Sequence, residues 1–163
     1  MKGFELVEIR GLSGMECRIY SVCMEGDEAT VFEKFVEDNI EVYRDELVDI
    51  YNRLRFIGNE SGAREQYFKL NEGRPGDMVA ALYDCPDKRL RLYCIRLSKV
   101  VLILGGGGRK LVRAWQDDET LKTEAELMMS ISERIYRAMR EKELWIDDEQ
   151  GLCGTKCFFD DED

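Results

Sequence analysis

Residues 89–110 read RLRLYCIRLSKVVLILGGGGRK and contain the most regular strand pattern in the sequence. In residues 89–97 apolar side chains alternate with mainly basic ones, a pattern typical of a β-strand with one buried face. Residues 100–104 are apolar on both faces, which indicates a strand in the middle of a sheet. Only Ser98 and Lys99 join the two strands, and parallel strands need a much longer connection, so we predict an antiparallel pair. Residues 105–108, all glycine, are predicted to form a flexible turn.

The rest of the chain alternates between strand-like and helical periods. Apolar residues at spacings of three and four predict helices over 31–40, 43–57 and a long stretch that begins at Asp117 and Asp118. Gly58 is suited to a left-handed cap at the end of the second helix. Alternating patterns predict further strands over 4–10, 16–24, 65–70 and 78–83, with polar turns at 71–77 and 85–88. The prediction is therefore an α+β fold with a mainly antiparallel sheet.

The length and composition predict one domain. A chain of 163 residues with 44% hydrophobic residues can bury a single substantial core. We expect this α+β domain to span residues 1–146. Residues 147–163 end in DDED and have no clear periodicity, so they are predicted to be a mobile acidic tail.

Charge is segregated along the chain. Residues 62–113 hold 11 Lys or Arg against 5 Asp or Glu, whereas the whole chain has a formal net charge of −10. A local positive field attracts phosphate even when the overall charge is negative. Any nucleic-acid contact is therefore expected to be confined to one patch within this block.

The six cysteines and the first residues bear on the compartment. The N-terminal MKGFELVEIR has charges where a signal peptide needs an apolar run, and no apolar stretch approaches a membrane span. We therefore expect reduced thiols, a cytoplasmic location and no membrane contact. Cys153 and Cys157 form one C-x₃-C pair, but zinc takes four ligands and the chain has no histidine. No metal and no cofactor are expected.

A row of cations lies along the strand at 89–97. Because side chains alternate, Arg89, Arg91 and Tyr93 are expected to share one face, and arginines bind phosphate bidentately. Arg109 and Lys110 follow the neighbouring strand and are expected to close on the same rim. The alternative is that the arginines are ordinary solvated strand residues paired with acids, the more frequent situation for Arg89 and an even choice for Arg91.

Tyr67 and Lys69 open the basic block. The two side chains share a face of the predicted strand 65–70, so they are candidates to extend the phosphate site. An ordinary exposed strand face is the more frequent arrangement for such a pair.

The strand LRLYCIR, the strand VVLILGGGGRK and the helix after them resemble the RelE/HigB-type toxin superfamily, including its phage-derived relatives, over roughly residues 64–140. MVAALYD resembles the family's neighbouring strand. The resemblance implies a RelE-like antiparallel sheet with helices packed on one face. It also implies metal-independent cleavage of mRNA on the ribosome, with a cognate antitoxin protein as partner. Carried over by residue, Arg91 would stabilise the phosphate, and Tyr93 and Lys110 would complete the catalytic set. Arg89, Arg109, Tyr67 and Lys69 would bind RNA.

The chain departs from that pattern in charge and in chemistry. It has no histidine and is acidic, whereas typical members are basic. These departures favour the alternative function, a non-catalytic RelE-like module that binds a protein partner. The acidic tail adds one more hypothesis, that residues 147–163 lie on the basic patch and mask it.

Overall fold

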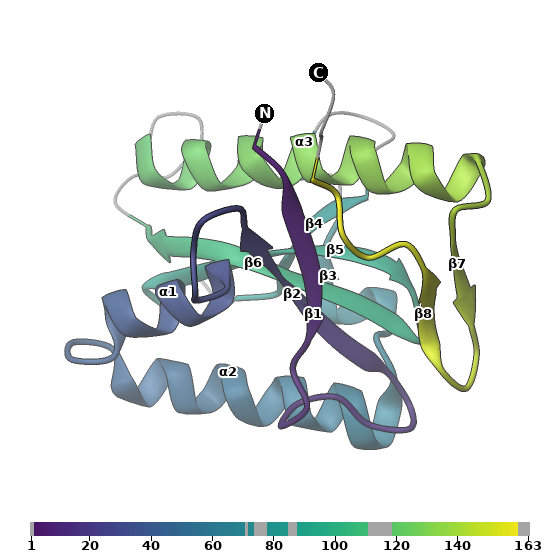
Figure 1. Cartoon of the computed structure of the whole chain (residues 1–163). Helices are drawn as coiled ribbons and strands as arrows, with labels where there is room; N and C mark the ends of the chain where they lie inside the picture. The colour runs from purple at the N-terminus through teal and green to yellow at the C-terminus, as the bar shows by residue number, and fades with distance from the viewer. Residues whose placement is uncertain (1, 71, 74–77, 85–87, 111–118, 160–163) are drawn as a thin grey trace.

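The computed structural model describes residues 2–70, 72–73, 78–84, 88–110 and 119–159 (Figure 1). The elements in chain order are β1 (Phe4–Glu8), β2 (Arg18–Met24), α1 (Val31–Asn39), α2 (Arg44–Phe56), β3 (Phe68–Lys69), β4 (Val79–Leu82), β5 (Leu90–Ser98), β6 (Val101–Arg109), α3 (Glu119–Arg140), β7 (Leu144–Asp147) and β8 (Gly151–Gly154). A π-helical turn (Ile57–Ser61) follows α2, and a 3₁₀ turn (Glu65–Tyr67) precedes β3.

Six strands form the main sheet in the order β1-β2-β6-β5-β4-β3. Every neighbouring pair is antiparallel except β2 and β6, which are parallel. A parallel pair needs a long connection, and the chain between β2 and β6 includes both early helices and three strands. The α+β class, the mainly antiparallel sheet and the interior position of the apolar strand at 100–104 are confirmed.

Helices cover both faces of the sheet, not the one face that the family resemblance implies (Figure 1). α1 and α2 pack their apolar residues against one face, with Phe32, Leu47 and Leu54 in the core. α3 packs Ala125, Met128 and other apolar residues against the opposite face. A strand buried on both faces must be apolar throughout, which is why residues 101–104 carry no polar side chain.

The glycine run is part of β6, and the predicted turn at 105–108 is therefore wrong. A Cβ on Gly107 would lie 1.9 Å from the carbonyl oxygen of Arg91, and one on Gly105 would lie 2.6 Å from the sulfur of Met128. The glycines let β5 and α3 approach the strand closely. The pairing of β5 with β6 shifts by one residue between Leu92 and Cys94, as in a β-bulge.

The early helices begin and end close to their predicted bounds. Thr30 and Glu33 form a capping box at the start of α1, with a 3.1 Å hydrogen bond from the Glu33 N–H to Thr30 Oγ1. The left-handed residue after α2 is Gly62, with φ of 76°, and not the predicted Gly58. Gly58 is required for another reason, since a Cβ there would lie 2.1 Å from the carbonyl oxygen of Leu12.

The segment predicted as a tail is structured as far as residue 159. β7 and β8 form a hairpin, and the N–H of Phe158 donates to the carbonyl of Phe4 at 2.7 Å. The Arg18 guanidinium donates to the carbonyl of Glu149 at 2.8 Å, and Arg18 pairs with Val101 at the start of β6. The basic end of β6 is roughly 26 Å further along the strand at about 3.3 Å per residue. Glu149 and the β7–β8 hairpin therefore lie far from that end, and the masking hypothesis is wrong for the hairpin. Residues 156–158 bond to β1, which β2 separates from β6.

The remaining differences are small. Residues 65–70 contain a 3₁₀ turn and the two-residue β3 in place of one long strand. Most of the predicted turns at 71–77 and 85–88, the helix start at 117–118 and the last four residues lie outside the described residues. Within the described part of the chain, no helix is both long enough and apolar enough to span a membrane.

Candidate anion-binding site

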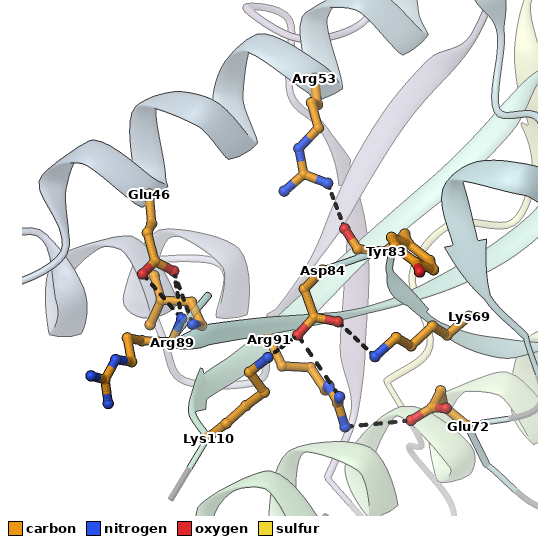
Figure 2. Close-up of polar contacts among 10 residues, drawn as sticks. Glu46, Arg53, Lys69, Glu72, Tyr83, Asp84, Arg89, Arg91 and Lys110 are labelled. Carbon is orange, nitrogen blue, oxygen red and sulfur yellow. Dashed lines mark hydrogen bonds and ion pairs between the residues drawn. The ribbon is translucent and has the colours of Figure 1, made fainter. Parts of the chain in front are cut away.

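Three cations surround one buried carboxylate at an end of the main sheet. Lys110 Nζ lies 2.5 Å from Asp84 Oδ2, Lys69 Nζ lies 2.9 Å from Oδ1, and Arg91 Nη2 lies 3.8 Å from Oδ2. Arg91 Nη1 also lies 3.8 Å from Oε1 of Glu72. We call these five residues the Asp84 cluster, and Figure 2 shows the three cationic side chains pointing at the Asp84 carboxylate.

The register of the sheet brings the cluster together. Arg91 of β5 pairs with Gly108 of β6, and the N–H of Lys110 donates to the carbonyl of Arg89 at 2.7 Å. Asp84 follows β4, which pairs with β5, and Lys69 is the last residue of β3, which pairs with β4. Four neighbouring strands therefore each supply one charged residue from one end of the sheet. The expected convergence of Arg91 and Lys110 is present.

Asp84 is the negative centre of the cluster. Its side chain is only 4% exposed. Burial alone would raise the pKa of this carboxyl, but hydrogen bonds from Lys110 and Lys69 and the charge of Arg91 outweigh that effect and hold the pKa below its ordinary value. Asp84 is therefore ionised at neutral pH.

Arg91 is held less tightly than the two lysines. Its side chain is 11% exposed, and both of its ion pairs with described residues are 3.8 Å long. Its Nε is buried and makes no hydrogen bond to any described residue. A guanidinium with long ion pairs and an unused N–H retains donors for another acceptor.

Tyr93 is not available to a ligand. Arg91 and Tyr93 do share a strand face, as the alternation predicts, but α3 covers that face at Tyr93. Tyr93 is fully buried in the core beside α3 residues such as Leu121. Its predicted catalytic and stacking roles are wrong for this structure.

Arg89 and Arg109 lie at the exposed rim of the same sheet end. The backbone N–H groups of Arg89 and Leu90 donate to the carboxylate of Glu46 in the first turn of α2, all at 3.0 Å. The Arg89 guanidinium points away from Asp84 (Figure 2), and among the described residues no acid pairs with it. Arg109 Nη1 donates to the hydroxyl of Tyr43 at 3.4 Å.

The rim is therefore divided between the two faces. Arg109 is paired in register with Leu90, whose side chain packs on the α1–α2 face, whereas the Lys110 side chain reaches the Asp84 cluster. Arg109 and Lys110 were expected to join the arginine row of β5 together. Lys110 lies beside Arg91 in the Asp84 cluster, whereas Arg109 contacts Tyr43.

Tyr67 and Lys69 also lie in different surroundings, one beside α2 and the other in the Asp84 cluster. Lys69 joins the cluster, and its ammonium lies 5.7 Å from the centre of the Tyr83 ring. Tyr67 lines an apolar pocket of about 240 Å³ with Phe56 and Leu82, on the side of α2. Tyr67 is thus placed for apolar packing and not beside the cluster cations.

The three acids Asp84, Glu72 and Glu46 were missed by the sequence interpretation. The sequence position of Asp84 could have indicated its role, because this acid comes at the end of the apolar run MVAALYD within the basic block. Glu72 and Glu46 had no such signal, since they are two of many acids on polar segments.

The cluster has the composition of an anion-binding site and not of a metal site. Among the described residues no group of three or more potential metal-ligating side chains lies together. Three cations face two carboxylates, and the rim arginines add further positive charge. No protein-family model matches the chain, and no curated protein or solved structure matches it.

Proposed function

We propose that the chain is a toxin-like protein of the RelE/HigB type that acts on RNA at the ribosome and is restrained by a cognate antitoxin protein. The observation that supports it is the surplus of positive charge at one end of the sheet. There, Lys69, Arg91 and Lys110 already enclose one anion. In this proposal Asp84 occupies the place that an RNA phosphate would take, and Arg91 is the cation that turns to the phosphate.

The exposed rim provides the first contact with RNA. Arg89 is solvent-exposed and has no acidic partner among the described residues, so a phosphate can approach it without displacing a carboxylate. Metal-independent cleavage of the bound mRNA would further require a base for the 2′-hydroxyl. Asp84 is a poor candidate for that step, because its pKa is lowered and it would be displaced by the phosphate, so the base would have to be another group.

The test is induced expression in bacteria, with growth and RNA cleavage as readouts. Arg89→Ala is the informative variant because this side chain supports no ion pair in the described structure. Arg10→Ala is the matched control, an exposed arginine in the turn after β1. We expect wild type and Arg10→Ala to arrest growth and Arg89→Ala to arrest it less.

The binding of a single-stranded RNA oligonucleotide gives a second readout. Loss of one phosphate contact should reduce the slope of log affinity against log salt by about 0.7 for Arg89→Ala. Harmless wild-type expression, or equal slopes for Arg89→Ala and Arg10→Ala, would contradict the proposal.

A second candidate is a non-catalytic RelE-like module that binds a protein partner. It is favoured by the burial of Tyr93, by the absence of histidine from the sequence and by the internal pairing of the cluster cations with Asp84 and Glu72. Under this candidate the wild-type protein leaves RNA uncut and growth unaffected, and a partner protein co-purifies with it.

A further inference from the structure

A second pocket lies on the other side of β6 from the Asp84 cluster, where β2 and β6 separate. The two strands pair only as far as Ser21 and Leu104. Ser21 Oγ donates to the carbonyl of Leu104 at 2.8 Å and accepts from the N–H of Phe32 at 3.3 Å, which fixes the start of α1 at the separation point. Beyond this point α1 takes the place of β2 beside β6, and a pocket of about 230 Å³ is present between β6, α1 and α3.

Glu124 of α3 contributes a carboxylate to this pocket. A Cβ on Gly106 would lie 2.5 Å from Glu124 Oε1, so the carboxylate rests directly on the backbone of the glycine run. The carboxylate is half-buried and has no hydrogen bond or ion pair with the described residues. Burial, and then the charge of Asp38, raise its pKa, while Lys34 acts in the opposite direction.

The other charges at the pocket leave negative charge in excess. Lys34 is the one cation among the described residues of the lining, but its Nζ is 2.5 Å from Asp27 Oδ2, a carboxylate outside that lining. Asp38 stands at the rim and adds a second acid. A cation bound beside Glu124 would offset the burial of this carboxylate and the charge of Asp38.

The apolar part of the pocket lining favours an organic cation over a metal ion. Met24, Phe35 and Leu127 bring apolar surface from β2, α1 and α3. A metal ion needs several oxygen ligands and gains nothing from such walls. A carbon chain that ends in an ammonium group matches both parts of the lining.

We infer that this pocket binds a small alkylammonium group, whose charge pairs with Glu124 and whose carbon chain packs against Met24, Phe35 and Leu127. The site is independent of the proposed action on RNA, because it uses none of the residues of the Asp84 cluster. A free alkylamine and a lysine side chain of a partner protein both carry an alkylammonium group. They differ in that the lysine is attached to a peptide backbone.

The experiment is an NMR titration of the full chain with n-butylammonium. Uncharged n-butanol and anionic butyrate are the matched probes, and N-acetyl-lysine amide distinguishes a lysine side chain from a free amine. We expect n-butylammonium to bind saturably with a dissociation constant of about 1 mM, and the other two butyl probes to bind at least about tenfold more weakly.

Two variants separate this pocket from nonspecific attraction. Glu124→Gln keeps the shape of the side chain and should weaken n-butylammonium binding about tenfold or more. Glu126→Gln removes an exposed charge two residues away on the same helix and should leave binding unchanged. The inference is overturned if the wild type shows no saturable shift, if n-butanol binds as tightly, or if Glu124→Gln retains the affinity.

Discussion

Replacement of Asp84 by asparagine should move stability and RNA affinity in opposite directions. Asparagine keeps the shape of the side chain but removes the charge that holds Lys69, Arg91 and Lys110. Breaking a buried ion pair costs about 3–5 kcal/mol, and both lysines are partly exposed and can turn toward water. We therefore expect the free energy of unfolding to fall by about 3 kcal/mol.

Urea unfolding measures this loss directly. With a slope of about 2 kcal/mol per molar, the midpoint should fall by roughly 1.5 M while the slope is unchanged. Asp49→Asn is the matched control, since Asp49 forms an exposed i,i+4 pair with Arg53 at 3.1 Å, and its loss should cost no more than about 0.5 kcal/mol.

The pH dependence identifies the carboxylate as the cause. The pKa of Asp84 is lowered in the folded protein, so its contribution is fully present above the ordinary pKa of about 3.9 and is lost as the pH falls through the lower folded value. The stability difference between wild type and Asp84→Asn should therefore be constant at neutral pH and shrink in strong acid.

The RNA measurement completes the prediction. If Asp84 competes with phosphate for the three cations, Asp84→Asn should bind single-stranded RNA about threefold to tenfold more tightly. A stability loss below about 1 kcal/mol would refute the structural reasoning. A lower RNA affinity in a folded variant would refute the competition between Asp84 and phosphate.

Two further predictions concern the core of the sheet. Gly107→Ala should lower the free energy of unfolding by about 3 kcal/mol or prevent folding, because the new Cβ would lie 1.9 Å from the carbonyl oxygen of Arg91. Gly11→Ala is the control and should fold normally, since no atom lies within 4 Å of its new Cβ. Thermal unfolding of the two variants tests this prediction. Iodoacetamide should label the exposed Cys157 and not Cys94 in the native protein, because burial raises the pKa of the Cys94 thiol to about 12. Mass spectrometry of peptides from the labelled protein measures this, and rapid labelling of native Cys94 would contradict its burial.

Much of the fold was predictable from local periodicity. The strand pair at 89–104, the two early helices and the N-terminal strand pair each carry a pattern strong enough to fix the element and its approximate bounds. The same patterns gave the α+β class. Alternation also placed Arg91 and Tyr93 correctly on one face of β5.

The surroundings of those residues were not predictable in the same way. Alternation indicates which side chains share a face, but it does not indicate what covers that face, and α3 covers it at Tyr93. The strand conformation of Gly107 depends on its close contact with Arg91, a neighbour distant in sequence. The partner role of Asp84 likewise depends on the register of four strands, which no single segment encodes.

The contact between the C-terminal segment and β1 has a consequence for solubility. The outer strand of a sheet exposes unpaired backbone groups and can recruit a second copy. Here the N–H of Leu6 donates to the carbonyl of Lys156 at 2.8 Å, and Glu5 bridges to Cys157, so this border is closed by the chain itself. The opposite border is β3, only two residues long. Truncation before Lys156 would open the five-residue edge of β1 as a template for edge-to-edge aggregation.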